Sequence, residues 1–347
     1  MLILVLNPGS TSLKLAIYEN ETMRQSKKLV FAAEMMERLR DPDVRASYCQ
    51  ELIEAYLRDE GVSVESLDCI ASRGGVLGKV NTGAYTVNEK MVEFVRNSPS
   101  VVHSVGVMIG YNMMSPLGKP CIIYDAVSAD EWDPIAKVSG IKGYERITHQ
   151  HTLNTREIVS RLAVVLGKPV TDVNAIVSHL GGGIDTTFFR GGRIIESLTY
   201  NDLGFSPDRC GAVNVNDLLD MTEQVPISEL HALNRGKGGL VSHFGTADEA
   251  EVEVMMEAGD EYAALVLEAM AYRVAQCIGA GAVALEGKID GIVLTGGIAR
   301  SEYVTEWITR RVSFLGKIFL MPGEFEVEAL AAAALRVIKG EEQTQEY

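Results

Sequence analysis

The chain reads IVSHLGGGIDTTFFRGGRIIES over residues 176–197, and this stretch is the clearest indication of the fold. Two apolar or β-branched runs flank the triplet Gly181, Gly182 and Gly183, and a third run follows the glycines at 191–192. This pattern predicts a strand, a tight hairpin, a second strand, a turn and a third strand. Glycines at a hairpin tip allow positive φ angles and let main-chain N–H groups approach an anion, as in phosphate-binding loops. An ordinary hairpin turn is the commoner interpretation of such a triplet taken alone.

The N-terminus has the same layout. Apolar residues at 2–6 lead into the polar sequence NPGSTS at 7–12, and residues 13–18 alternate as a second strand. A polar, glycine-bearing hairpin therefore opens each half of the chain. Such duplicated units, each followed by α/β material, predict two similar domains whose hairpins face one cleft that would hold a phosphate chain.

Composition narrows the range of partners and compartments. Asp and Glu number 47 against 32 Lys and Arg, so the formal net charge is −15. An acidic surface argues against nucleic acid or an anionic membrane as a partner. The five cysteines are scattered and form no C-x-x-C pair, which indicates free thiols in a reducing compartment and neither a disulfide framework nor a zinc site. The apolar N-terminal run lacks a basic n-region and is interrupted at Asn7-Pro8, so we expect a cytoplasmic protein.

Helical and strand patterns alternate along the chain, and its 347 residues correspond to about two domains. We predict an α/β fold with one domain over residues 1–128 and a second over residues 129–324. Residues 325–347 carry the last helical pattern and are expected to return to the first domain. The longest helical pattern, over residues 260–287, is expected to be buried or to form a subunit contact. Charged and polar residues along it argue against a membrane span.

Two charged residues lie at the ends of predicted strands. Arg73 follows the strand at 67–71, at the position where open α/β sheets bind ligands, although a single arginine is more often a solvated surface residue. Asp125 ends the strand at 121–125, where a carboxylate is as often a helix cap as a magnesium ligand.

The sequence RITHQHTLN at 146–154 contains two histidines two residues apart. His149 and His151 are poor candidates for a metal site, because no third ligand of suitable spacing accompanies them and residues at i and i+2 of a helix do not face one another. One histidine near an anion site is the better interpretation. Arg209 lies further along, in a predicted loop at 204–211.

Gly296 and Gly297 separate a predicted strand from a helix that starts at Ser301. A strand, two glycines and a helix N-terminus allow a nucleotide to approach closely, although the dipeptide alone is weak evidence. Glu324 and Glu326 open the last helix, where acidic residues can simply complement the helix dipole.

Taken in order, these motifs resemble the acetokinase family. They are NPGSTSLK at 7–14, SRGG at 72–75, HS at 103–104, YD at 124–125, HTLN at 151–154, HLGGG at 179–183, FSPDR at 205–209, LTGG at 294–297 and PGEFE at 322–326. The resemblance covers essentially the whole chain. It is greater to the butyrate kinase branch than to the acetate kinase branch, because acetate kinases tend to carry Asn where Gly182 or Gly183 lies and HGTS where this chain has HTLN.

The resemblance implies the actin-like fold, in which two duplicated ribonuclease-H-fold domains enclose ATP and Mg²⁺ in a cleft. It also implies reversible transfer of the γ-phosphoryl group of ATP to a short-chain carboxylate, giving an acyl phosphate and ADP. Butyrate is the expected acceptor, with isobutyrate, propionate and acetate as alternatives. The alternative from another class is a non-catalytic actin-like nucleotide switch, which would have no reason to keep two arginines and a histidine in its cleft. A homo-oligomer is expected, as in the family.

By the same resemblance, Arg73 and Arg209 would hold the carboxylate and the transferring phosphoryl group, for which the guanidinium fork is suited. His151 would donate to a phosphoryl oxygen. The expected magnesium ligands are Asp125 and either Glu324 or Glu326. The expected nucleotide-binding residues are Asn7, Ser10, Ser12, Lys14, His179, Gly181, Gly182, Gly183, Gly296 and Gly297. The candidates for the acyl pocket are Val76, Leu77, His103 and Val105. Asp185 departs from the family pattern, in which small or apolar residues usually follow the triplet.

Overall fold

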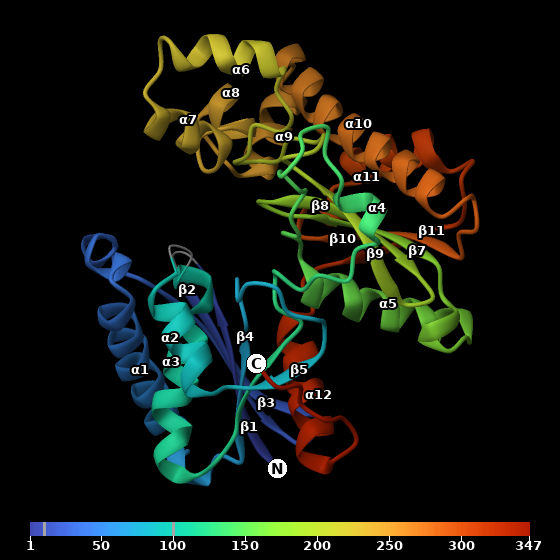
Figure 1. Cartoon of the computed structure of the whole chain (residues 1–347). Coiled ribbons are helices and arrows are strands. Elements are labelled where there is room, and N and C mark those ends of the chain that lie inside the picture. Colours follow the sequence, from blue (N-terminus) through green and yellow to red (C-terminus); the bar gives the residue numbers. More distant parts are fainter. Residues whose placement is uncertain (10–11, 99–100) are drawn as a thin grey trace. The chain divides into compact units, whose positions relative to one another are not determined.

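The chain forms two compact units, which are described separately (Figure 1). The computed structural model describes residues 1–9, 12–98 and 101–347, leaving aside the side chains of residues 33 and 101–103. Unit 1 combines Met1–Asp130 with Phe325–Tyr347, and unit 2 is Glu131–Glu324. Short 3₁₀ helices lie at Ala33–Met35, Arg38–Arg40, Val64–Ser66, Ser115–Leu117, Val170–Asp172 and Ile298–Arg300.

Unit 1 contains a mixed sheet with the strand order β3-β2-β1-β4-β6-β5. Its strands are β1 (Leu2–Pro8), β2 (Ser12–Glu19), β3 (Thr22–Val30), β4 (Cys69–Arg73), β5 (Ala84–Thr86) and β6 (Cys121–Tyr124). β2 pairs antiparallel with β1 and β3, whereas β1, β4 and β6 run parallel. Its helices are α1 (Pro42–Asp59), α2 (Glu89–Arg96), α3 (Val101–Met114) and α12 (Glu326–Lys339). α1 and α3 lie on one side of the sheet and α12 lies on the other (Figure 1).

Unit 2 contains a mixed sheet with the strand order β11-β10-β7-β8-β9. Its strands are β7 (Ala175–Leu180), β8 (Ile184–Arg190), β9 (Arg193–Thr199), β10 (Gly291–Gly296) and β11 (Ile318–Pro322). Its helices are α4 (Pro134–Lys137), α5 (Thr152–Leu166), α6 (Val215–Thr222), α7 (Ile227–Asn234), α8 (Gly239–Phe244), α9 (Glu249–Glu257), α10 (Glu261–Ala284) and α11 (Glu302–Val312). α5 packs on one face of this sheet and α10 on the other (Figure 1).

The two sheets share one topology. In each sheet, the first three strands of the unit form an antiparallel meander. The first strand of the meander then pairs in parallel with a fourth strand, which pairs in parallel with a fifth. The order is β3-β2-β1-β4-β6 in unit 1 and β9-β8-β7-β10-β11 in unit 2. The carboxyl ends of the parallel strands of each unit therefore meet at one edge of its sheet. That edge is where open α/β sheets bind ligands.

The burial of each strand follows its place in the sheet. β1 is buried along almost its whole length, because it is a central strand covered on both faces. β3 is exposed along its length and has the polar sequence TMRQSKKLV. The sequence does not predict β3, because no apolar period marks it. It forms as an edge strand whose main chain pairs with β2, and its lysines and arginine suit an exposed edge.

Several predicted helix starts are confirmed by their caps. Asp260 accepts a hydrogen bond from the backbone at 262 and 263, and Ser301 accepts from Val304 N, as expected for the helices predicted to begin there. α2 begins in the same way, with Asn88 accepting from Met91 N. The glycine-rich sequence GKGG at 236–239 suggests a flexible loop, but α8 already begins at Gly239.

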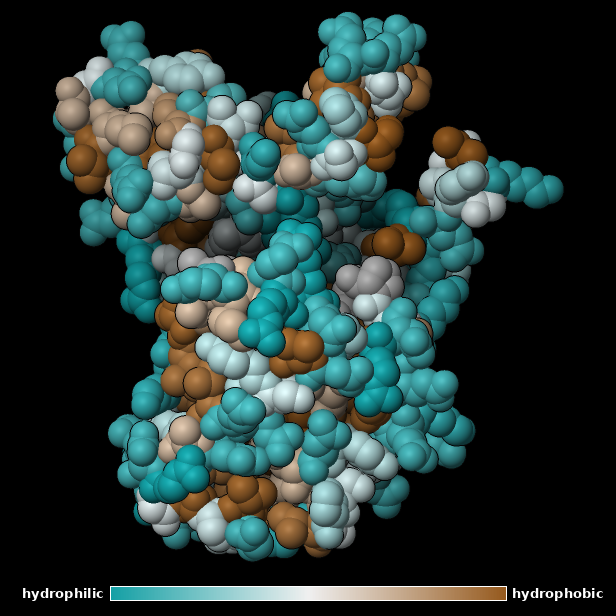
Figure 2. All heavy atoms as spheres, turned by 90° about the vertical axis from the view of Figure 1, so that its left-hand side faces the viewer, coloured by the Kyte–Doolittle hydropathy of each residue, from teal (hydrophilic) through white to brown (hydrophobic). Residues whose placement is uncertain are grey.

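The long helix α10 lies in the core of unit 2. Within the described residues it is the one helix long and apolar enough to cross a membrane by length and composition, and half of its most apolar 18-residue window is buried by the rest of the chain. Burial of this kind is common for a core helix. Hydrophilic residues cover much of the face drawn in Figure 2, with apolar residues in small groups between them, in keeping with a chain that carries 47 acidic and 32 basic residues.

Candidate active site

The glycine triplet forms the predicted hairpin turn between β7 and β8. Gly181 N donates to Gly183 O at 3.2 Å, which closes the turn. Gly182 is exposed, and no atom lies within 4 Å of the position that a Cβ would take there. The Ser206 hydroxyl donates to Gly182 O at 2.7 Å and ties a second loop to the turn. The main chain of the triplet is therefore fixed in place and open to a ligand.

Two histidine rings lie against this turn. The rings of His151 and His179 are stacked, with centroids 3.9 Å apart and planes inclined by 17°. A Cβ on Gly181 would lie 3.0 Å from His179 Nε2, and a Cβ on Gly183 would lie 3.5 Å from His151 Cε1. A side chain at Gly181 would therefore press on the His179 ring, and one at Gly183 would contact the His151 ring. Asn154, in the first turn of α5, bonds His179 Nδ1 through its amide nitrogen at 3.0 Å.

Asp185 lies beneath the histidines on β8 and is 2% exposed. Its Oδ2 forms a short contact with His151 Nδ1 and accepts from His151 N at 3.1 Å. Burial by itself raises the pKa of Asp185, but the charge and hydrogen bonds of His151, with the charge of His179, outweigh burial and hold that pKa below its usual value. Asp185 is therefore an anion paired with a histidine, and the sequence alone does not predict this pair.

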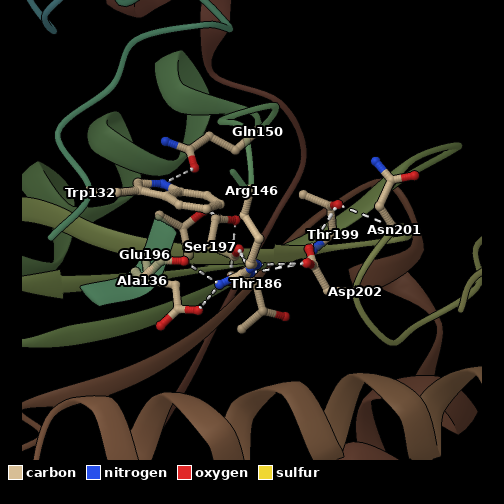
Figure 3. A network of polar contacts seen from close by, with 11 residues as sticks. Trp132, Ala136, Arg146, Gln150, Thr186, Glu196, Ser197, Thr199, Asn201 and Asp202 are labelled. Atoms are coloured by element: carbon tan, nitrogen blue, oxygen red, sulfur yellow. Dashed lines mark hydrogen bonds and ion pairs between the residues drawn. The ribbon is translucent and has the colours of Figure 1, made fainter. Parts of the chain in front are cut away.

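The segment that leads to His151 is fixed on the sheet by Arg146 (Figure 3). The acceptors of its guanidinium are Asp202 Oδ1 at 3.1 Å, the Ala136 carbonyl at 2.8 Å, the Ser197 carbonyl at 3.2 Å and the carboxylate of Glu196. Arg146 also lies over the ring of Trp132, 5.0 Å from its centroid. Trp132 Nε1 in turn donates to Gln150 Oε1 at 3.0 Å. These contacts hold the residue immediately before His151.

His149 differs from His151 in its surroundings. Burial, followed by the positive charge of Arg235, lowers the pKa of His149 to about 4. His149 is therefore neutral at neutral pH. The pairing with Asp185 identifies His151, the histidine expected from the family motif, as the one next to the glycine triplet.

Arg209 lies in a tight loop with Ser206, where each residue donates its N–H to the other's carbonyl, at 3.2 and 3.3 Å. Its side chain is 14% exposed, pairs with Asp208 at 2.5 Å and lies over the Tyr200 ring, 5.5 Å from the centroid. Arg209 Nε is buried and has no hydrogen-bond partner among the described residues. A Cβ on Gly239 would lie 1.7 Å from Ser206 O, so only glycine allows α8 to support this loop.

A cavity of about 490 Å³ opens beside the triplet in unit 2, within the size range of small-molecule sites. It is lined by Gly181, Gly182, Pro207, Ala247, Asp248, Glu249, Ala250, Glu253, Gly297, Ile298, Arg300, Ser301 and Glu324. The structure thus places Gly181, Gly182 and Gly297, which come from two separate predicted motifs, around one cavity. Gly296 lies just behind, with φ +92, where a Cβ would be 2.2 Å from Leu180 O.

Two glutamates that line this cavity, Glu249 and Glu253, lie close together, and the pKa of one of them is raised. Burial, followed by a hydrogen bond to Glu253, raises the pKa of Glu249 to about 8. Glu253 also accepts a short hydrogen bond from the hydroxyl of Ser301. A protonated Glu249 can donate a hydrogen bond, which an ionised carboxylate cannot.

The predicted residues of unit 1 converge at the carboxyl ends of its parallel strands. Asn7 lies near the end of β1, Arg73 ends β4 and Glu326 begins α12. Asn7 Nδ2 donates to Glu326 Oε2 at 2.6 Å, and Arg73 Nη1 lies 3.7 Å from the same oxygen. Glu326 therefore belongs with Asn7 and Arg73, whereas Glu324 lines the cavity of unit 2.

Asp125 follows β6 in a left-handed conformation with φ 46 and is 2% exposed. Its Oδ1 accepts from Gly83 N at 2.8 Å. The helix-cap interpretation is wrong, because the chain that the structure describes begins no helix after Asp125 until α4 at Pro134. The carboxylate instead holds a loop amide.

The remaining predicted residues of unit 1 lie on several elements and do not form a single cluster with Asn7, Arg73 and Glu326. Ser12 and Lys14 are half-buried on β2, and Val76 is half-buried in the loop after β4. Leu77 and Val105 belong to the core of unit 1, at 1% and 0% exposure. Ser10 and the side chain of His103 lie outside the described residues.

Comparison with known sequences identifies the family of the chain. A sequence model described as the acetokinase family matches residues 137–323, just over half of the chain. The chain belongs to the acetokinase family. It is therefore a kinase whose phosphoryl acceptor is a short-chain carboxylate.

Solved structures agree with this acetokinase assignment in fold. A propionate kinase from Francisella tularensis subsp. tularensis SCHU S4 has a TM-score of 0.78 at 17% identity, over 96% of this chain and 98% of that chain. Acetate kinases from Porphyromonas gingivalis and Entamoeba histolytica have TM-scores of 0.79 and 0.77 at 19% and 18% identity, over 97% and 95% of this chain and 99% and 98% of theirs. The predicted α/β fold with two duplicated actin-like domains is confirmed.

The candidate site contains residues that sequence patterns do not reveal. The contacts of Asp185 join positions 34 residues apart, and Glu249 and Glu253 reach the cavity from a helix with no recognisable motif. One signal was available for Asp185, because a carboxylate interrupts an otherwise apolar or β-branched strand immediately after the triplet.

Proposed function

We propose that this acetokinase-family kinase transfers the γ-phosphoryl group of ATP reversibly to butyrate. The observation that best supports a catalytic role is the gathering of His151, His179 and the loop of Arg209 around the open glycine triplet. A turn that served only to reverse the direction of the chain would not need several hydrogen-bond donors around it. The main-chain N–H groups, imidazoles and guanidinium together suit a group rich in anionic oxygen.

In the proposed reaction, a carboxylate oxygen of the acid bonds to the γ-phosphorus while the bond from that phosphorus to the β,γ-bridging oxygen breaks. ADP takes the bonding electrons, and no proton has to move. Catalysis of such a transfer consists mainly of positioning and charge neutralisation. Arg209 and His151 would meet the transferring phosphoryl group, and Arg73 would hold the carboxylate. Asn7, Ser10, Ser12, Lys14, His179 and the glycines at 181–183 and 296–297 would bind the nucleotide.

Magnesium would be held by Asp125 and Glu326. Mg²⁺ prefers oxygen ligands and usually takes one or two carboxylates together with substrate phosphates, so two buried carboxylates of unit 1 fit this donor set. Among the described residues, no three His, Cys, Asp or Glu side chains form a group that could hold a metal by themselves. A bound Mg²⁺ supplies positive charge that offsets the charge of the phosphate chain.

Butyrate is the proposed acceptor because the motifs at 151–154 and 181–183 resemble the butyrate branch of the family. Isobutyrate, propionate and acetate are the alternatives, and the solved structures of similar fold are named as propionate and acetate kinases. One methylene group in an apolar pocket is worth about 1–3 kcal/mol, so the preference is graded between neighbouring acids.

The test is a panel of acids of two to five carbons incubated with ATP and Mg²⁺, with the acyl phosphate trapped as its hydroxamate. We expect the highest kcat/KM with butyrate, followed by isobutyrate, and a lower value with acetate. A higher value with acetate or propionate would overturn the choice of acceptor. Binding of ATP without acyl phosphate from any acid would favour the non-catalytic nucleotide switch.

A further inference from the structure

We infer that Asp185 is a positioning residue for His151, which it holds with Nδ1 bonded to the carboxylate and Nε2 left for the phosphoryl group. The inference rests on the proposed function and assigns a role to a residue that lies outside the family motifs. Asp185 touches no ligand in this scheme. It acts through the orientation and charge of one imidazole ring.

The contacts of Asp185 fix the ring from two sides. Oδ2 bonds both the backbone N–H and Nδ1 of His151. Oδ1 accepts from the Thr187 hydroxyl at 3.2 Å, and Thr187 is itself bonded to Ser197 Oγ at 3.1 Å. The ring of His179 covers the face of the His151 ring. His151 therefore has its backbone, ring edge and one ring face held at the same time.

The exposure of the two side chains separates their roles. The Asp185 side chain is 3% exposed, whereas the His151 side chain is 28% exposed. His151 Cε1, which lies between the two ring nitrogens, is next to the glycine triplet. The carboxylate is thus sealed behind the ring, and the imidazole is the part of the pair that a ligand at the triplet can reach.

The hydrogen-bond partner of one imidazole nitrogen determines what the other nitrogen can do. A neutral imidazole donates from one nitrogen and accepts at the other, and the partner of one nitrogen decides the state of the second. With Nδ1 donating to a carboxylate, Nε2 can donate to a phosphoryl oxygen only when the ring carries both protons. The carboxylate of Asp185 is the acceptor that keeps a proton on Nδ1, whereas an amide at the same place is a weaker acceptor and can turn its nitrogen toward the ring.

Other charged groups act on the same ring. His179 faces it from β7, His149 lies close by on the preceding segment, and Arg209 and Arg235 are near His149. Of these, Arg209 and Arg235 are positive and His149 is neutral at neutral pH, and Asp185 is the anion in direct contact with the ring. Its removal should therefore leave His151 Nδ1 without this acceptor.

Asp185 also supports the start of α5, because His151 is the residue before that helix and donates its N–H to the carboxylate. A merely structural role would end there. Asp185→Asn separates the two roles, since the amide oxygen can still accept from the backbone N–H but carries no charge. Asp290→Asn is the matched control. Asp290 likewise accepts a backbone N–H, from Asn174 at 2.8 Å, and pairs with a lysine, but it lies at the opposite end of the sheet from the triplet.

The first experiment observes the ring directly. The chain has six histidines, so imidazole ¹⁵N-labelled protein gives a tractable spectrum in which His151→Gln identifies the signal. We expect a strongly deshielded Nδ1 proton on His151 that disappears in Asp185→Asn and persists in Asp290→Asn. A His151 ring protonated at Nε2 alone, with Nδ1 bare, would overturn the inference whether or not the protein phosphorylates any acid.

The second experiment measures turnover of the acid that the parent uses best. Asp185→Asn should lower kcat about 10–100-fold, a typical loss for the partner that orients a functional histidine, while the KM values for ATP and the acid change less than about threefold. His151→Gln combined with Asp185→Asn should be no slower than His151→Gln alone. A folded Asp185→Asn variant with parental kcat would contradict the role, whereas a parent inactive on every acid would contradict only the proposed function.

Discussion

Arg209 and Arg73 are both predicted to meet the substrate, and the structure holds them differently. Arg209 is paired with its neighbour Asp208 and keeps a buried Nε with no hydrogen-bond partner in the described part of the chain. Arg73 shares the oxygen of Glu326 with Asn7 at a distance of 3.7 Å. A buried guanidinium nitrogen without an acceptor is costly unless a ligand completes it, so Arg209 is the better placed of the two for a transient anionic charge.

Replacing each arginine by alanine should separate their roles. Arg209→Ala should lower kcat by about 10²–10³, as for loss of a preorganised electrostatic donor. Arg73→Ala should also raise the KM for the acid, because it would hold the carboxylate in the ground state. Arg40, which is 77% exposed, provides the control, and Arg40→Ala should leave stability within about 0.5 kcal/mol. Hydroxamate assays that find both Arg209→Ala and Arg73→Ala within about threefold of the parent, under about 1 kcal/mol of barrier, would refute this assignment.

Glu249 should make the stability of the protein depend on pH. Its folded-state pKa is raised to about 8 from 4.5, so the folded state keeps a proton that the unfolded state loses. Its contribution to stability is therefore fully present below about pH 4.5 and is lost as the pH rises through about 8. Glu249→Gln cannot ionise and should flatten the free energy of unfolding over this window, as measured by urea titration at several pH values. The exposed Glu251→Gln on the same helix should keep the parental slope, and an equal slope in Glu249→Gln would count against the raised pKa.

Helix α10 shows how an element is fitted to its sheet by two glycines with different surroundings. A Cβ on Gly281 would lie 2.6 Å from Phe188 Cε1, and Phe188 is 1% exposed in the core. A Cβ on Gly279 would meet no atom within 4 Å. Of these two glycines, Gly281 is therefore the one that allows α10 to pack closely on β8.

The two glycines form a matched pair for mutation. Gly281→Ala should lower the free energy of unfolding by about 1–3 kcal/mol, because the ring of Phe188 has nowhere to move. Gly279→Ala should raise it by about 0.5–1 kcal/mol through helix propensity. Urea titration measures both. If Gly279→Ala is as destabilising as Gly281→Ala, the space seen beside Gly279 must be filled by something else, such as a second copy of the chain.

At the scale of the whole molecule, the chain leaves unit 1 after Asp130 and returns to it at Phe325. The returning helix α12 packs against β1 and β4, and Leu330 on it is completely buried. Unit 2 has its own core, in which Leu267 of α10 is equally buried. Unit 1 is therefore complete only when the C-terminal segment of the chain is in place.

A pair of core truncations should report on this organisation. Leu330→Ala removes a buried side chain at a cost of about 2–5 kcal/mol. Hydrogen exchange followed by mass spectrometry should then show faster exchange in residues 1–130 and 325–347 and little change in residues 131–324. Leu267→Ala should give the reverse pattern. Faster exchange of residues 131–324 in Leu330→Ala would show that the two units do not unfold separately.

The sequence alone determined the local features. Strand and helix periods, the hairpin at 181–183, the starts of α10 and α11 and the order of the motifs were all predictable, because each depends on residues that are neighbours along the chain. The duplicated α/β fold follows from the same patterns together with the family resemblance. β3 was not predictable, since its pairing with β2 rather than its composition makes it a strand.

The tertiary structure decided which polar groups meet. Asn7 and Glu326 are 319 residues apart and share one hydrogen bond, while Glu324 and Glu326, only two residues apart, belong to different units. Asp185 meets His151 because of two features of the folded chain. The register of β8 on β7 fixes the position of Asp185, and the start of α5 fixes the position of His151. A sequence pattern records which residues are near in the chain. The energies that bring a carboxylate under an imidazole depend on strand register, helix placement and burial, and those exist only once the chain has folded.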